Sequence, residues 1–92
     1  MDFSEALLCL KQGLRVARSG WNGKSMWIAL GAGSQDLPAS AFWNKHSKAY
    51  AEANGGTANV LPYIIFKTAD GDILMGWLAS QTDLLSNDWV VL

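Results

Sequence analysis

Two apolar runs on either side of an Asp-Gly turn constrain the fold of this chain most strongly. The runs cover residues 61–67 and 73–78, and Asp70-Gly71 lies between them. Because Asp-Gly favours the positive φ angles of a tight turn, the runs are predicted to pair as antiparallel strands. Both runs place apolar side chains on both faces, so each face needs a cover. One face can take a helix, and the other needs a second helix or another copy of the chain.

The N-terminal residues have the pattern of a short amphipathic helix. Apolar side chains recur at helical spacing from Phe3 to Leu10, and Asp2 and Glu5 have the offset of an N-cap and its capping-box partner. Gly13 favours the left-handed conformation that ends a helix. The sequence therefore predicts a helix over residues 4–12.

The other predicted elements complete a small α+β fold. Strands are expected over residues 14–18, 26–30 and 88–92, a turn over 19–23, a helix between 38 and 54, and a short Ser-capped helix over 80–85. The Gly-Ala-Gly-Ser run at 31–34 lacks the Gly-Lys-Ser/Thr of a P-loop, so it is interpreted as a loop. We expect one domain over residues 1–92, in which a small antiparallel sheet packs against the N-terminal helix, with a helical insertion at about 31–60.

Composition limits the kinds of partner. The chain has 92 residues, half of them apolar and 16% charged, and this thin polar surface predicts a homo-oligomer, either a dimer or a tetramer. A net charge of −1 argues against binding to a nucleic-acid polymer. A single cysteine and the lack of a long apolar run predict a cytoplasmic protein that does not enter a membrane.

Catalytic and metal motifs are weak in this sequence. The only histidine, His46, lies on an apolar helical stripe, and the only cysteine, Cys9, lies in the first helix, where it is interpreted as a small buried residue. Asp70 and Asp72 belong to the hairpin turn. We therefore predict no enzyme activity, no metal and no cofactor, although a carboxylate in a closed pocket remains a way to activate water.

Two short segments have the composition of a ligand site. Trp77 precedes a row of small hydrogen-bonding residues, and Trp21 stands in a glycine-flanked turn, while Trp89 is expected in the core. The polar neighbours of the first two tryptophans are Asn22, Lys24, Ser80, Gln81, Thr82 and Asp83. Stacking rings, orienting polar groups and a lysine beside glycines suit a flat, anionic small molecule. Packing at an interface explains Trp21 equally well, and helix capping is an alternative role for Asp83.

Several motifs, in this order along the chain, resemble a small phage and prophage family that is associated with the second type of Thoeris anti-defence protein. They are Phe3-Ser4-Glu5-Ala6-Leu7, Lys11-Gln12-Gly13, Val16-Ala17-Arg18, Gly20-Trp21-Asn22-Gly23-Lys24, Lys67-Thr68-Ala69-Asp70-Gly71, Trp77-Leu78-Ala79-Ser80-Gln81-Thr82-Asp83 and Asp88-Trp89. The resemblance spans nearly the whole chain and is weakest from residue 31 to residue 61.

The resemblance implies a sponge in an infected bacterial cell. Such an oligomer, similar to the family's tetramers, sequesters a cyclic ADP-ribose isomer made by an immune sensor, and some relatives also sequester cyclic oligonucleotides. The implied ligand-binding residues are Phe3, Trp21, Asn22, Lys24, Trp77, Ser80, Gln81, Thr82 and Asp83. Trp27, Trp43 and His46 in or near the middle region are further candidates to line or cover the pocket. A phage structural module and a hydrolase of the same signal are the alternatives.

Overall fold

The computed structural model describes residues 1–21 and 24–92, so the predicted turn residues Asn22 and Gly23 lie outside the described part of the chain. These residues form two compact units, one from Met1–Gly31 with Tyr63–Leu92 and the other from Ala32–Pro62. The α+β class is confirmed, since helices accompany a five-stranded and a two-stranded antiparallel sheet. None of the described helices has the length and apolar character needed to cross a bilayer.

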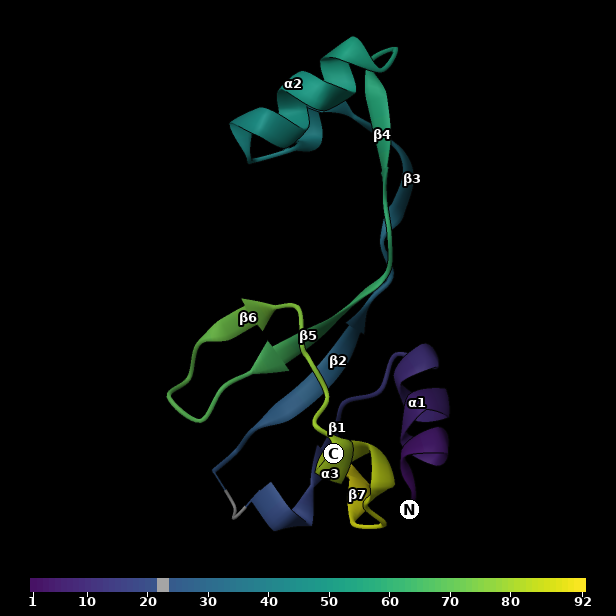
Figure 1. Ribbon diagram of the computed structural model, residues 1–92, viewed down its shortest axis with the longest axis vertical. Coiled ribbons are helices and arrows are strands. Elements are labelled where there is room, and N and C mark those ends of the chain that lie inside the picture. Colours follow the sequence, from purple (N-terminus) through teal and green to yellow (C-terminus); the bar gives the residue numbers. More distant parts are fainter. Residues whose placement is uncertain (22–23) are drawn as a thin grey trace. The chain divides into compact units, whose positions relative to one another are not determined.

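The first unit holds the five-stranded sheet, whose strands run in the order β6-β5-β2-β1-β7 (Figure 1). Every neighbouring pair in this sheet is antiparallel. The elements of the unit are α1 (Phe3–Lys11), β1 (Val16–Arg18), the 3-10 turn η1 (Ser19–Trp21), β2 (Trp27–Gly31), β5 (Tyr63–Lys67), β6 (Ile73–Met75), α3 (Gln81–Leu85) and β7 (Trp89–Val91).

Local interactions set the ends of α1 as the sequence predicts. The Asp2 carboxylate accepts a hydrogen bond from the Glu5 amide, and the Glu5 side chain accepts one from the Asp2 amide. Gly13 has a φ of +86°, which closes the C-terminus. Ala6 and Leu10 on one face of α1 are fully buried. The predicted helix is thus confirmed, with its start one residue earlier.

The predicted hairpin is also confirmed, with shorter strands. Lys67 is the register partner of Ile73, and the turn is closed by hydrogen bonds between Thr68 and Asp72. Gly71 has a φ of +91°. The second strand ends at Met75, because Gly76 has a φ of +123° and leads the chain out of the sheet. This exit releases Trp77 from the sheet and allows it to join the core.

The core lies between α1 and one face of the sheet. Its fully buried members are Ala6, Leu10, Val16, Ile28 and Trp89. The register places Val16 opposite Ile28 and Ile28 opposite Phe66, so these side chains share a face. Trp89 is the largest buried side chain, at 1% exposure, which confirms its predicted core position.

The opposite face of the sheet is apolar and partly exposed. One row across it contains Ala29, Ile65 and Met75, and the next contains Trp27, Lys67 and Ile73. Ile73 is 57% exposed and Met75 is 50% exposed. No described helix of the first unit packs on this face, since α1 contacts the core side.

The second unit differs from its prediction. It contains β3 (Ser34–Pro38), the 3-10 turn η2 (Ala39–Ala41), α2 (Lys45–Ala53) and β4 (Thr57–Val60). The helix is shorter than the 38–54 window, because Asn44 caps it through its side chain and leaves Phe42 outside. The prediction missed β3 and β4, and Ser34 begins a strand instead of belonging to a loop. β3 shows no apolar alternation, the alternation in β4 is limited to Ala58 and Val60, and Asp36 has a φ of +51° at an irregularity in the β3–β4 register.

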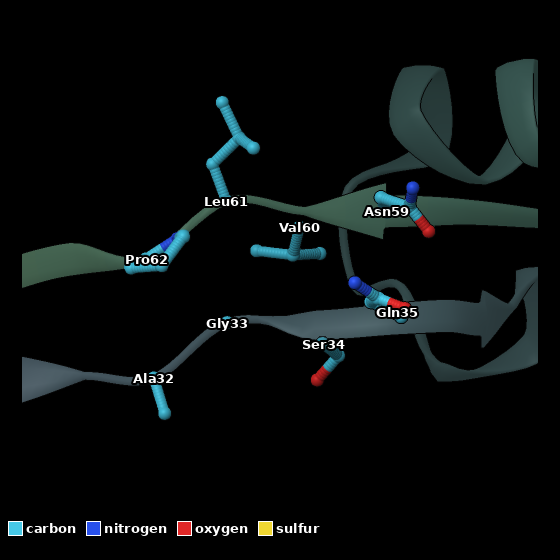
Figure 2. Close-up of a pocket in the computed structure, with 8 residues that line it drawn as sticks. All are labelled: Ala32, Gly33, Ser34, Gln35, Asn59, Val60, Leu61 and Pro62. Atoms are coloured by element: carbon cyan, nitrogen blue, oxygen red, sulfur yellow. The ribbon is translucent and has the colours of Figure 1, made fainter.

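The conformation of Gly33 leads to a specific prediction for the stability of the β3–β4 ribbon. Its φ is +74°, and a methyl group on it would collide with the carbonyl oxygen of Val60, a residue of the neighbouring strand in Figure 2. Gly55 has nearly the same φ of +78° but open space around it. We expect Gly55→Ala to cost about 1 kcal/mol from backbone strain and Gly33→Ala to cost roughly 1–3 kcal/mol more from the collision.

Amide hydrogen exchange measured by mass spectrometry tests this prediction. The amides of β3 and β4 should lose protection in Gly33→Ala and keep most of it in Gly55→Ala. Equal protection in the two variants would show that the close approach at Val60 does not hold the ribbon together.

Candidate functional site

An aromatic cluster surrounds the buried ring of Trp89. The centroids of Phe3 and Trp21 each lie 5.3 Å from that of Trp89, and the centroid of Trp77 lies 6.2 Å from it. The Trp21 and Trp77 rings meet Trp89 edge to face, and Trp21 also meets Phe66 at 6.0 Å. Phe3, Trp21 and Trp77 stay partly exposed. The fold therefore presents three aromatic rings on one packed support.

The short helix α3 lies beside this cluster and is held to it by hydrogen bonds. The Trp89 indole donates to the Asp83 carbonyl at 2.9 Å, and the Trp21 indole donates to the Asp83 carboxylate at 3.3 Å. Ser80 is the N-cap, and its hydroxyl accepts from the Asp83 amide while the Asp83 carboxylate accepts from the Ser80 amide. Capping, one of the two roles considered for Asp83, is thus observed.

Arg18 connects α3 to the start of β7. Its Nη1 donates to Asp83 at 2.7 Å and its Nε donates to Asp88 at 2.8 Å. The Arg18 and Asp83 side chains are only 14% and 13% exposed, so solvent screens this pair less than a surface pair. Asp88 also accepts from the Gly20 amide at 2.8 Å. The network fixes the turn that carries Trp21 against the helix that follows Trp77.

These contacts shift the acid strengths of the residues involved. Hydrogen bonds to Asp88 and Asp83 raise the pKa of Arg18. Burial by itself raises the pKa of Asp83, but hydrogen bonds from Arg18 and Ser80 more than offset it, and the pKa lies below its ordinary value. The hydrogen bond from Arg18 lowers the pKa of Asp88. Both carboxylates are therefore ionised and share one guanidinium, which offsets one of their two negative charges.

The predicted site residues fall into three groups. Phe3, Trp21 and Trp77 come together around Trp89, and Ser80 and Asp83 are engaged in capping and in the Arg18 network. Lys24, Gln81 and Thr82 have exposed side chains, and Asn22 lies outside the described residues. The ring of Trp21 packs on Phe66 and Trp89 of its own chain, whereas the sequence predicted a ligand or an interface as its partner.

Sequence reasoning also missed Arg18 and Asp88 as the ties between these segments. Arg18 ends a strand predicted from its apolar pattern, and it is 65 residues from Asp83 and 70 residues from Asp88. Its alternation with Val16 and Ala17 was the available signal, because it places a charged side chain on the same face as a core residue.

The second unit has a groove of its own at the start of the β3–β4 ribbon (Figure 2). It encloses about 360 Å³, which is enough for a small ligand. The residues that line it are Ala32, Gly33, Ser34, Gln35, Asn59, Val60, Leu61 and Pro62, all uncharged. The Asn59 amide oxygen already accepts from the Asp36 amide at 2.8 Å. This lining offers no charge to a phosphate, so the groove does not suit the anionic ligand expected from the sequence.

Within residues 1–21 and 24–92, no three His, Cys, Asp or Glu side chains gather in a way that could hold a metal ion. His46 is exposed on α2, and Cys9 is half-buried against the core. The chemistry of the aromatic cluster is therefore that of stacking, hydrogen bonding and charge.

The architecture is that of a small α+β protein with an aromatic cluster braced by a partly buried ion-pair network. The family model described as the Thoeris anti-defense 2-like domain matches residues 1–92, so the chain belongs to this family of anti-defence proteins. It is 45% identical over 89 residues to a protein of Bacillus phage SP01 named Thoeris anti-defense 2, and the match covers 97% of this chain and 91% of that protein.

Proposed function

We propose that this protein is a sponge that binds a cyclic ADP-ribose isomer without cleaving it. By lowering the free concentration of the signal in the cytoplasm of an infected bacterium, it keeps the immune effector inactive. Three partly exposed rings on a rigid support, beside exposed polar side chains of α3, carry this proposal in a chain of the anti-defense family. A cyclic oligonucleotide offers similar chemistry as an alternative ligand.

Each group in the cluster has a role suited to such a ligand. Phe3, Trp21 and Trp77 offer ring faces or edges to a base. Gln81 and Thr82 are free to form hydrogen bonds with ribose hydroxyls, and Lys24 supplies positive charge for a phosphate. Arg18 offsets one of the two charges of Asp83 and Asp88, which reduces the repulsion between these carboxylates and an anionic ligand.

Tight binding requires a second copy of the chain to help enclose the ligand. Nanomolar binding corresponds to about −12 kcal/mol, whereas stacking supplies roughly 1–3 kcal/mol per base. The ligand must therefore be enclosed on several sides. Two leucines near the cluster support closure by another protomer, since Leu78 is 95% exposed and Leu85 is 74% exposed. We accordingly propose a dimer or tetramer whose contacts complete the pocket.

Capture and release of the ligand test the proposal. The purified protein is incubated with extract from bacteria whose Thoeris defence has been triggered, washed, heat-denatured, and the released material is analysed by mass spectrometry. We expect an intact cyclic ADP-ribose isomer, at no more than one molecule per chain. A linear product together with depletion of the signal at substoichiometric protein would identify a hydrolase. No released nucleotide would favour a structural module.

Gln81→Ala tests the assigned position of the pocket with little risk to the fold. Its side chain is exposed, so its replacement should change stability by less than about 0.5 kcal/mol. We expect it to reduce captured ligand several-fold, while Gln12→Ala, a change of the same type at an exposed residue after α1, should not. Light scattering on the same samples reports the assembly, and a 10.0 kDa monomer would contradict closure by a second copy.

A further inference from the structure

We propose that Arg15, Trp27 and Lys67, on the sheet face opposite α1, form a subsite for the phosphates of the nucleotide. The inference rests on the proposed function, because it assigns part of that ligand to a surface outside the aromatic cluster. The cluster and this surface lie on opposite faces of the sheet, so a ligand that stacks on the cluster of one copy reaches the subsite of a second copy in the proposed oligomer. From the sequence, Lys24 was the predicted phosphate residue, and neither Arg15 nor Lys67 was a candidate site residue.

The sheet register brings the three residues together. Trp27 on β2 and Lys67 on β5 are directly opposite partners, so their side chains leave the sheet on the same face. Arg15 directly precedes β1, which is the strand next to β2. Its guanidinium carbon lies 5.5 Å from the centroid of the Trp27 ring. The Arg15 carbonyl accepts from the Leu92 amide at 3.0 Å, which holds the backbone beneath it. The indole thus lies within reach of two cationic side chains.

Lys67 is held in a defined position. Its Nζ donates to the Ser25 carbonyl at 2.9 Å, and Ser25 has the left-handed φ of 56°. A lysine ammonium has three N–H donors, so two remain for a ligand. The contact also brings Lys67 to the residue that follows Lys24, which links the new subsite to the predicted phosphate residue.

The charges on this face lack an acidic counterpart within the described residues. Among the described residues, ion pairs join Arg18 to Asp83 and to Asp88. Neither Arg15 nor Lys67 has a carboxylate of these residues within ion-pair distance. Asp72, next to the register partner of Lys67, makes no such pair. An anion supplies the charge that this face lacks.

The positions of these two cations suit phosphate groups better than a single carboxylate. The Arg15 guanidinium carbon lies over the Trp27 ring, and a guanidinium offers paired N–H donors that match the paired oxygens of a phosphate. Lys67 adds a compact charge on the strand at the other side of β2. The neighbouring Ala29 and Ile65 are apolar and partly buried, and water screens the half-buried Lys67 less than the exposed Arg15. A nucleotide diphosphate provides two anionic groups for these two cations.

Calorimetric titration of charge-neutral variants tests the subsite. The probe is the cyclic ADP-ribose isomer made from NAD by a purified Thoeris sensor, and the proteins are full-length wild type, Arg15→Gln, Lys67→Gln and the control Lys48→Gln. Lys48 is an exposed lysine of α2. We expect Arg15→Gln and Lys67→Gln each to weaken binding at least roughly tenfold and to flatten its salt dependence, because each removes one charged contact. Lys48→Gln should match wild type.

The outcomes separate the two proposals. If wild type binds and both test variants bind within about twofold of it, the subsite is wrong and the sponge function stands. If wild type does not bind, the sponge function fails and the subsite fails with it. Light scattering guards against an indirect effect, since loss of assembly together with affinity would assign Arg15 and Lys67 to a contact between copies and overturn the subsite.

Discussion

Trp89→Ala is expected to lower the free energy of unfolding by about 3–5 kcal/mol, the usual cost of emptying a buried Trp site. The ring is 1% exposed and supports Phe3, Trp21 and Trp77, so its removal leaves a cavity at the centre of the core. It also leaves the Asp83 carbonyl without its indole donor. A domain of this size has roughly 5–15 kcal/mol in total, so the variant should be close to unfolding.

Urea titration followed by circular dichroism measures this effect. Trp43→Ala is the matched control, because the Trp43 side chain is 87% exposed and its loss should cost less than about 0.5 kcal/mol. If Trp89→Ala gives no folded baseline, Trp89→Phe provides a smaller truncation that should still be clearly less stable than wild type. A loss at Trp43 equal to that at Trp89 would contradict the assignment of the core.

Arg18→Gln is expected to lower the melting temperature at about pH 7 by roughly 4–8 °C, a large shift for a side chain at a strand end. The change leaves the carboxylates of Asp83 and Asp88 without the guanidinium that pairs with both. It also weakens the tie between the Trp21 turn and α3. Lys48→Gln, which removes the same charge from an exposed position, should melt close to wild type.

The pH dependence identifies the cause of this loss. The pKa values of Asp83 and Asp88 are lowered in the folded protein, so their stabilising effect is fully present above the ordinary carboxyl pKa of about 4. It is lost as the pH falls through the lower folded values. The difference in melting temperature between wild type and Arg18→Gln should therefore persist down to about pH 5 and shrink below about pH 4. A difference that stays constant to about pH 2 would mean that packing, rather than charge, is responsible.

The aromatic cluster of the candidate site was partly predictable from the sequence, because its tryptophans stand in unusual local settings. Trp21 and Trp77 stood out from the strand patterns around them, and the structure gathers both around Trp89. Their arrangement was not predictable, since Gly76 had to redirect the chain before Trp77 could reach the core. The roles of Ser80 and Asp83 as caps were accessible from spacing alone.

The sequence by itself determined the features that depend on residues close together in the chain. The capping box of α1, the turn at Gly71 and the Ser80 cap each join residues only three or four positions apart. Short-range contacts of this kind form at little cost in chain entropy, so their residue patterns are strong predictors. The apolar periodicity similarly indicated one helix against one face of an antiparallel sheet.

Tertiary structure alone decided the features that depend on distant partners. The strands β3 and β4 are stabilised by pairing with each other, since β3 has no strand pattern of its own and β4 has only Ala58 and Val60 at alternate positions. Arg18 meets Asp83 and Asp88 across 65 and 70 residues, and Arg15 reaches Trp27 only through the register of β1 with β2. A one-residue shift in that register would turn every side chain of a strand to the other face, so these contacts follow from the assembled sheet.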